Sequence, residues 1–268
     1  MTLISDRIVG AAHRLPRPLL VALDVDGTLA PIVEDPEAAR VPRATRATIR
    51  DLARTPGVRV ALVTGRSASS LGRVVGRIDP VFRALEHGRV VVRPRDPVPP
   101  PRLDPASSER LAAFERWARE HAVPHGARLE RKGASRAVHV RALLESSPDQ
   151  ARRILRAARQ RADGLGLHAR AGKAVLEAEA APGDKGDALE AIRAASRARG
   201  VLYAGDDLTD FPAIERAVRL GGIGIFVRSR ERSRGPRGAR AEVVDGTEAL
   251  AEVLAHLADA LRTRGAPP

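Results

Sequence analysis

The chain has 268 residues, no cysteine and a formal net charge of +13, from 46 Lys and Arg against 33 Asp and Glu. Without cysteine, a disulfide framework and any Cys-based metal or redox site are excluded. There is no run of 18 apolar residues, and Asp6, Arg7, His13 and Arg14 make the first residues too polar for a signal peptide, so we expect a cytoplasmic protein without membrane contact.

The positive charge raises the question of a nucleic-acid partner. The basic residues are spread over the whole chain, and only four Phe, one Trp and one Tyr are present to stack on bases. We therefore expect a small anionic substrate and no nucleic acid. Almost all the basic residues are arginine, and the three exceptions are Lys132, Lys173 and Lys185. Their retention suggests positions that need a compact ammonium group.

The first strand carries the clearest chemical signal. Apolar residues at helical spacing predict a helix over residues 1–15, ended by Pro16 and Pro18. The apolar run 19–23 predicts a buried strand, which is followed by Asp24, Asp26 and Gly27. Side chains two residues apart on a strand share a side, so the two carboxylates can form a site for Mg²⁺ and a phosphate. The alternative is a plain strand followed by an Asp-Gly turn.

A second strand–helix unit repeats this arrangement. The pattern predicts a helix over 43–54, a buried strand over 58–63 that ends at Thr64, and a helix from Ser67 to about residue 75. Thr64 and the start of that helix can both hydrogen-bond a phosphate, although Thr-Gly alone is a weak signal. His87 lies in a loop before a short strand at 90–92, as a site residue or as a satisfied loop residue.

Six prolines between residues 94 and 105 predict a stiff linker and a domain boundary. The following segment has its own rhythm: a helix over 107–122 with Ser107 or Ser108 as N-cap, strands over 127–131 and 137–143, a helix over 147–164, and a hairpin over 167–171 and 174–178. Pro182 and Gly183 mark the return to the first domain. We expect a core domain of residues 1–100 and 182–268, with residues 101–181 inserted as a smaller α+β domain.

The last segment supplies a cation and three acids. A helix is expected to open at Lys185 and to end near residue 199, before an apolar strand that leads into Asp206, Asp207 and Asp210. A short helix over 211–218, a strand over 222–227 and an amphipathic helix over 247–263 complete an α/β fold. Residues 228–240, rich in Arg, Gly and Ser, are a solvated surface turn or an anion-binding arm.

The order and content of these motifs resemble the haloacid dehalogenase (HAD) superfamily of phosphotransferases. The resemblance implies a Rossmann-like parallel-sheet core with an inserted cap domain, and an aspartyl-phosphate formed on Asp24. It implies Asp26 as general acid and base, and Thr64 with Lys185 as holders of the phosphoryl oxygens. It also implies that Asp24, Asp206 and the backbone carbonyl of Asp26 hold Mg²⁺, with Asp207 and Asp210 in the same metal motif.

The inserted segment is similar to that of trehalose-6-phosphate phosphatases. The similarity lies in Glu130-Arg131-Lys132-Gly133, His139-Val140-Arg141 and Gly172-Lys173-Ala174-Val175-Leu176-Glu177, supported by Thr64-Gly65-Arg66 and Glu86-His87-Gly88 in the core. It implies hydrolysis of trehalose 6-phosphate, with a trehalose-phosphate synthase as pathway partner. The substrate-binding residues that it implies are Arg66, His87, Gly88, Glu130, Lys132, Ser135, His139, Arg141, Lys173 and Glu177.

Three positions differ from that family's usual residues. Val140 stands where that family usually has Tyr, Phe211 stands where it usually has an acid, and Ala178-Glu179-Ala180 replaces the Arg-Pro that commonly follows the acid at Glu177. Another sugar phosphate therefore stays open as substrate: glucosyl- or mannosyl-3-phosphoglycerate, or sucrose 6-phosphate. Each charge of the inserted segment, taken alone, could also be a solvated surface charge. A non-catalytic basic binding module on a HAD scaffold is the alternative from another class.

Overall fold

The computed structural model of the chain describes residues 3–33, 35–99, 103–172, 174–229, 233–236, 238 and 240–263. The chain forms two compact units. The larger unit consists of Met1–Val98 and Gly183–Pro268, and the smaller unit of Pro99–Pro182. The domain limits expected from the sequence stay a prediction, and each unit is described below by itself.

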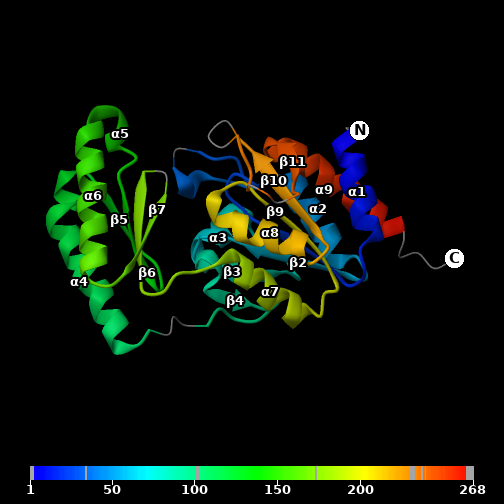
Figure 1. Ribbon diagram of the computed structural model, residues 1–268, viewed down its shortest axis with the longest axis horizontal. Helices are drawn as coiled ribbons and strands as arrows, with labels where there is room; N and C mark the ends of the chain where they lie inside the picture. The colour runs from blue at the N-terminus through cyan, green and yellow to red at the C-terminus, as the bar shows by residue number, and fades with distance from the viewer. Residues whose placement is uncertain are drawn as a thin grey trace. The chain divides into compact units, whose positions relative to one another are not determined.

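A seven-stranded sheet forms the centre of the larger unit (Figure 1). In spatial order its strands are β11 (Glu242–Asp245), β10 (Ile223–Arg228), β9 (Gly200–Gly205), β1 (Leu19–Leu23), β2 (Val58–Val63), β3 (Phe82–Leu85) and β4 (Val90–Val92). All neighbours are parallel except β3 and β4. This is the α/β HAD-like fold that the sequence predicts.

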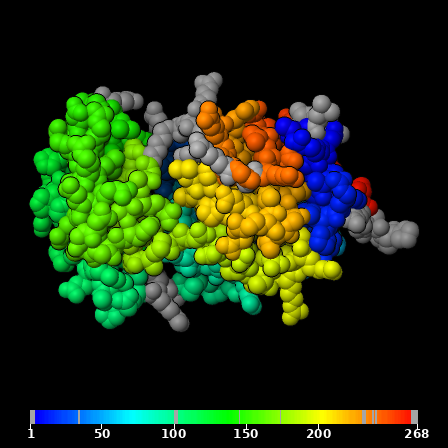
Figure 2. All heavy atoms as spheres, viewed as in Figure 1, coloured from blue at the N-terminus to red at the C-terminus, as the bar shows by residue number. Residues whose placement is uncertain are grey.

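Helices cover both faces of this sheet, which is why its central strands are apolar throughout. One face packs against α1 (Leu3–Arg14), α2 (Arg43–Arg54), α3 (Ala68–Val75) and α9 (Gly246–Thr263). The other packs against α7 (Lys185–Ser196) and α8 (Phe211–Arg219), which lie on the outside of the unit in Figure 2. Successive residues of β1 alternate between the apolar clusters on the two faces of the sheet. None of the helices among the described residues has the length and hydropathy needed to cross a bilayer.

The order β9–β1–β2 decides where the polar side chains meet. Leu23, the last residue of β1, lies opposite Leu62 of β2 and Ala204 of β9. Because the three strands are parallel, Asp24, Thr64 and Asp206 follow them at one edge of the sheet. The backbone N–H of Asp24 continues the ladder with a 2.9 Å hydrogen bond to the carbonyl of Ala204. Asp24 is thereby fixed to β9, the strand that leads into the other acids.

The smaller unit is an antiparallel sheet with helices on one face. In spatial order the strands are β5 (Arg128–Arg131), β6 (Ser135–His139), β8 (Val175–Glu179) and β7 (His168–Gly172). The register places Leu129, Val138 and Leu176 on the face that packs with α4 (Pro105–His121) and α6 (Pro148–Gly164). The opposite face carries Glu130 and Glu177, since side chains of a strand alternate between its faces.

Several elements differ from the sequence prediction. Asp104, and neither Ser107 nor Ser108, caps α4, with Pro105 in the first turn where a missing N–H does no harm. The strand expected over 137–143 begins and ends earlier, as β6, and the short helix α5 (Leu143–Ser146) follows. The strands β3 and β11 were not predicted, because charged residues interrupt their short apolar runs: Arg83 in β3, and Glu242 and Asp245 in β11.

Candidate active site

Three carboxylates and one ammonium group lie together at the carboxyl edge of the larger sheet. Asp24, Asp206 and Asp210 are all buried, and one oxygen from each lies within 4.8 Å of the others. Lys185, in the first turn of α7, donates hydrogen bonds of 2.7 Å to Oδ1 of Asp24 and to Oδ1 of Asp210. The hydroxyl of Thr28 lies 3.2 Å from Oδ2 of Asp24 and 3.2 Å from Oδ1 of Asp206, and its one hydrogen can be donated to either carboxyl group. Three acidic side chains thus face a single ammonium group.

The pKa values reflect this excess of acids. Burial raises the pKa of Asp24 well above its usual range, and Asp210 and Asp206 add to that effect against the opposing charge of Lys185. Burial and the neighbouring Asp210 raise the pKa of Asp206 to about 7. Burial alone would lower the pKa of Lys185, but Asp210 and Asp24 raise it above its ordinary value, so the ammonium stays charged.

Asp210 is held by more partners than its neighbours. Its Oδ1 also accepts a 2.6 Å hydrogen bond from the hydroxyl of Tyr203 on β9, and its Oδ2 accepts one of 3.0 Å from the N–H of Asp207. The latter contact belongs to a capping box that starts the 3₁₀ turn η4 (Leu208–Asp210). Burial, followed by the charges of Asp210 and Asp24, raises the pKa of Tyr203, so its hydroxyl stays a proton donor.

The donor set fits a hard divalent cation. Mg²⁺ prefers carboxylate oxygens, and a positive charge here would relieve the repulsion that raises the two carboxyl pKa values. Two glycines leave room for the acids: a Cβ on Gly27 would overlap the Asp206 carboxylate, and one on Gly205 would overlap that of Asp210. The buried triad could therefore bind a metal ion.

Asp26 is oriented differently from Asp24. Its carboxylate forms a bidentate pair with Arg66, from Nε to Oδ2 and from Nη2 to Oδ1, both at 2.7 Å. The Asp26 side chain is 41% exposed, whereas that of Arg66 is 9% exposed. The Asp26 side chain thus stays partly accessible to solvent while a buried arginine holds both of its oxygens. The roles expected for both residues stay predictions.

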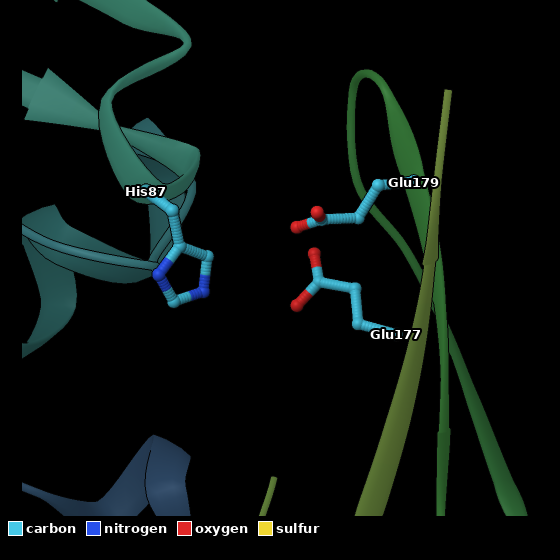
Figure 3. Close-up of side chains that lie close together, drawn as sticks. All are labelled: His87, Glu177 and Glu179. Carbon is cyan, nitrogen blue, oxygen red and sulfur yellow. The ribbon is translucent and has the colours of Figure 1, made fainter. Parts of the chain in front are cut away.

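Thr64 and the segment after β3 complete this edge. Thr64 is buried, and its hydroxyl accepts a 3.1 Å hydrogen bond from the N–H of Arg66. His87 has a positive φ of 58°, and its ring, visible in Figure 3, packs so closely on Gly65 that a Cβ there would overlap it. Gly88 (φ +97°) lies against the backbone of Asp184, the residue that caps α7. These close contacts fix the turn η2 (Glu86–Gly88) beside the start of the Lys185 helix.

On the smaller unit, most of the polar residues expected from the sequence lie on or beside one face of the sheet. His139 Nε2 lies 2.8 Å from Oε2 of Glu130. A hydrogen bond from His139 is the main reason that the pKa of Glu130 falls to about 2, despite the opposing effect of burial. Glu177 accepts hydrogen bonds from Lys132 at 3.0 Å and from Ser135 at 2.5 Å. Here each acid has a basic partner.

The remaining expected residues are less well defined. Arg141 follows β6 and is half-buried, while Lys173 lies outside the described residues. Glu179, which was not expected as a site residue, lies two residues beyond Glu177 on the same side of β8 (Figure 3). It is fully buried and pairs with Arg170 at 3.2 Å. Whether any residue of this face binds substrate stays a prediction.

The structure adds residues to the site that sequence reasoning missed. They are Thr28 and Tyr203, which contact the buried acids, and Glu37 and Ser70, which contact Arg66. The pairing of Arg66 with Asp26 was also not expected. Tyr203 could have been noticed, because the only tyrosine of the chain lies on the strand before the acids. Glu37 gave no signal, since it lies in a polar loop far from Arg66 in sequence.

Comparison with known proteins agrees with this geometry. The trehalose-phosphatase family model matches residues 22–243. A probable trehalose-phosphate phosphatase of Sinorhizobium fredii is 30% identical over 248 residues, covering 88% of this chain and 86% of that protein. An uncharacterized glycosyl hydrolase of Mycobacterium tuberculosis is 34% identical over 225 residues; the match covers 79% of this chain but only 16% of that protein's length.

Solved structures support the fold. The C-terminal domain of Candida albicans trehalose-6-phosphate phosphatase matches with a TM-score of 0.76 at 20% identity, over 96% of this chain and 97% of that one. A haloacid dehalogenase-like hydrolase from Bacteroides thetaiotaomicron matches with a TM-score of 0.63 at 15% identity, over 89% and 98%. The family match spans most of the chain, including the buried acids. The chain therefore belongs to the trehalose-phosphatase family.

Proposed function

We propose that this protein is a Mg²⁺-dependent phosphatase that hydrolyses trehalose 6-phosphate to trehalose and phosphate. The observation that carries the proposal is the buried cluster in which Lys185 bridges Asp24 and Asp210 beside Asp206. Phosphoryl transfer needs an aligned nucleophile and neutralised charge, and this cluster offers both. The family membership and the relatives' names support the choice of substrate.

Asp24 is the nucleophile of the proposed reaction. Its carboxylate attacks phosphorus, the bond between phosphorus and the sugar oxygen breaks, and that oxygen takes a proton from Asp26. In the second step Asp26 accepts a proton from water, whose oxygen attacks phosphorus and releases Asp24 as a free carboxylate. Lys185, at 2.7 Å from Asp24, orients the nucleophile, and Thr64 lies at the same sheet edge to receive a phosphoryl oxygen.

Asp24 and Asp206 are the residues best placed to hold Mg²⁺, because Asp210 accepts hydrogen bonds from Lys185, Tyr203 and the N–H of Asp207, more than either of its neighbours does. The backbone carbonyl of Asp26 and the side chain of Asp207 stay predictions as further ligands. When bound, the ion supplies positive charge to the oxygens of the transferring phosphoryl group.

The polar face of the smaller unit is the proposed sugar site. A sugar phosphate offers many hydroxyl groups, and this face presents donors and acceptors of both charges, among them Glu130, His139 and Glu177. A trehalose-phosphate synthase as partner and a cytoplasmic location stay predictions.

The test is phosphate release from a panel of sugar phosphates, with Mg²⁺ and with EDTA. The panel contains trehalose 6-phosphate, sucrose 6-phosphate, glucose 6-phosphate and glucosyl-3-phosphoglycerate. We expect Mg²⁺-dependent release with preference for trehalose 6-phosphate, and a loss of at least about 10³-fold in Asp24→Asn. If another member of the panel were preferred, the proposed reaction would stand and the proposed substrate would change. If the wild-type protein released phosphate from no member of the panel, a non-catalytic module would be favoured.

A further inference from the structure

The guanidinium group of Arg66 lies between Asp26 and a second set of contacts. Besides its two hydrogen bonds to Asp26, Arg66 donates from Nη1 to Oγ of Ser70 at 2.7 Å and from Nη2 to the carbonyl of Pro36 at 2.6 Å. Ser70 in turn donates to Oε1 of Glu37 at 2.9 Å. The guanidinium group is therefore also held by Ser70 and Pro36, which do not contact Asp26.

These contacts join three segments of the larger unit. Arg66 follows β2, Ser70 lies in α3, and Pro36 and Glu37 belong to the 3₁₀ turn η1 (Pro36–Ala38) in the loop after Asp26. Arg73 of α3 also donates to Glu37, at 2.6 Å. Burial would raise the pKa of Glu37, but the hydrogen bonds from Ser70 and Arg73 lower it, so Glu37 stays a carboxylate and retains its partners.

We propose that Arg66 is a positioning residue that aims the carboxyl group of Asp26 in both chemical steps, as the acid in the first and as the carboxylate base in the second, and that Glu37 and Ser70 keep Arg66 in place. The inference rests on the proposed function. A proton donor must lie within hydrogen-bond reach of the atom that it serves, and a displacement of about 1 Å can cost roughly a hundredfold in rate. Arg66 fixes both Asp26 oxygens, and the Asp26 side chain, 41% exposed, remains accessible to solvent.

The geometry requires arginine at this position. A bidentate contact depends on two N–H donors held in one plane, which lysine lacks. Arg66→Lys therefore keeps the positive charge and removes the alignment. The matched control is Arg77→Lys, because the side chain of Arg77 is 94% exposed and pairs only with Asp79 among the residues that the structure describes.

The proposal separates two kinds of phosphate ester. A sugar oxygen needs a proton from Asp26 to leave, whereas p-nitrophenolate leaves without one. The second step needs Asp26 as base with either ester. In Arg66→Lys we expect turnover of trehalose 6-phosphate to fall about 10-fold to 100-fold. With p-nitrophenyl phosphate we expect a fast burst of one p-nitrophenolate per active site, followed by slow turnover, because the aspartyl-phosphate accumulates.

Stopped-flow measurement of this burst, with steady-state kcat and KM for both esters, tests the proposal. Glu37→Gln and Ser70→Ala serve as second variants, because they loosen Arg66 without contacting Asp26; we expect the same pattern with losses of about threefold to tenfold. Circular dichroism shows which variants fold, and if Arg66→Lys does not fold these two decide.

Two results would overturn the proposal: turnover of trehalose 6-phosphate within twofold of wild type in all three variants, or equal losses of burst and turnover in folded variants, which indicates general damage to the site. Failure of the proposed function looks different. Wild-type protein would then hydrolyse neither ester, and both ideas would fall together.

Discussion

The two polar regions of this protein differ in the balance between acidic and basic side chains. In the larger unit, Asp24, Asp206 and Asp210 share the single ammonium group of Lys185, and the pKa values of Asp24 and Asp206 are raised. In the smaller unit, Glu130 pairs with His139 and Glu177 with Lys132. The pKa of Glu130 is lowered to about 2. The first region therefore has a deficit of positive charge that a bound cation can fill, and the second is balanced by its own side chains.

The largest difference should appear when one lysine is removed from each region. Lys185→Met leaves two buried acids without their cation, and we expect a loss of about 3–5 kcal/mol in the free energy of unfolding of the metal-free protein. In Lys132→Met, Glu177 keeps its hydrogen bond from Ser135, so we expect a loss of only about 1–2 kcal/mol. Urea unfolding in EDTA, with hydrogen exchange to assign each unit, measures both.

Equal losses in the free energy of unfolding of the two lysine variants would contradict the difference in charge balance between the two regions. Added Mg²⁺ provides the matched control. It should restore part of the stability lost in Lys185→Met, because the ion supplies charge to the same acids, and should leave the deficit of Lys132→Met unchanged.

A second difference concerns which kinetic constant each region controls. The Glu177 carboxylate lies on the proposed sugar face, remote in sequence from Asp24. In Glu177→Gln we expect KM for trehalose 6-phosphate to rise about 10-fold to 100-fold, because a site built for hydrogen bonds discriminates strongly when one is lost. Hydrolysis of p-nitrophenyl phosphate, which has no sugar, should stay within twofold.

The exposed Glu120 of α4, in the same unit, is the control for that experiment, and Glu120→Gln should change neither substrate. A Glu177→Gln variant that lost both activities equally would assign Glu177 to the chemistry or to folding, and would remove the sugar-binding role.

The two regions also differ in how far the sequence could predict them. Asp24, Lys185 and Asp206 each stand at a strand end or helix start, so local pattern and the parallel order of the strands were sufficient to bring them together. The contact between Arg66 and Asp26 joins residues 40 positions apart, and that between Lys185 and Asp210 joins residues 25 apart. Side-chain direction, which local pattern does not contain, decides such pairs.

On the smaller unit, alternation along β5 and β8, together with the strand register, places Glu130 and Glu177 on one face of the sheet. It could not predict that Lys132 lies beyond the end of β5 and still reaches Glu177 on another strand. It also gave no indication of Glu179, whose burial depends on contacts that the strand pattern does not encode. In both units, therefore, sequence pattern predicted the elements better than the pairs between them.

The charge deficit of the larger unit should make Mg²⁺ binding depend on pH. The pKa of Asp206 is raised to about 7, so below that pH a proton competes with the ion for this carboxylate. We expect the dissociation constant for Mg²⁺ to fall by up to about tenfold per pH unit as the pH rises toward 7, because Asp206 loses its competing proton over that range. Isothermal titration calorimetry in two buffers of different ionisation enthalpy measures both the affinity and the proton released. An affinity that stays constant between pH 5 and pH 7 would show that Asp206 is not a ligand.

The smallest effect is expected in the balanced region. Because the pKa of Glu130 is lowered from 4.5 to about 2, its ionised form stabilises the folded state fully above pH 4.5, and this stability is lost as the pH falls toward 2. The side chain is partly exposed, so we expect wild type to exceed Glu130→Gln by about 1 kcal/mol or less at pH 6, and by less at pH 3. Urea unfolding at several pH values gives this difference, with Glu120→Gln as control. A difference that grew as the pH fell would mean that Glu130, like the acids of the larger unit, carries a charge that its neighbours do not balance.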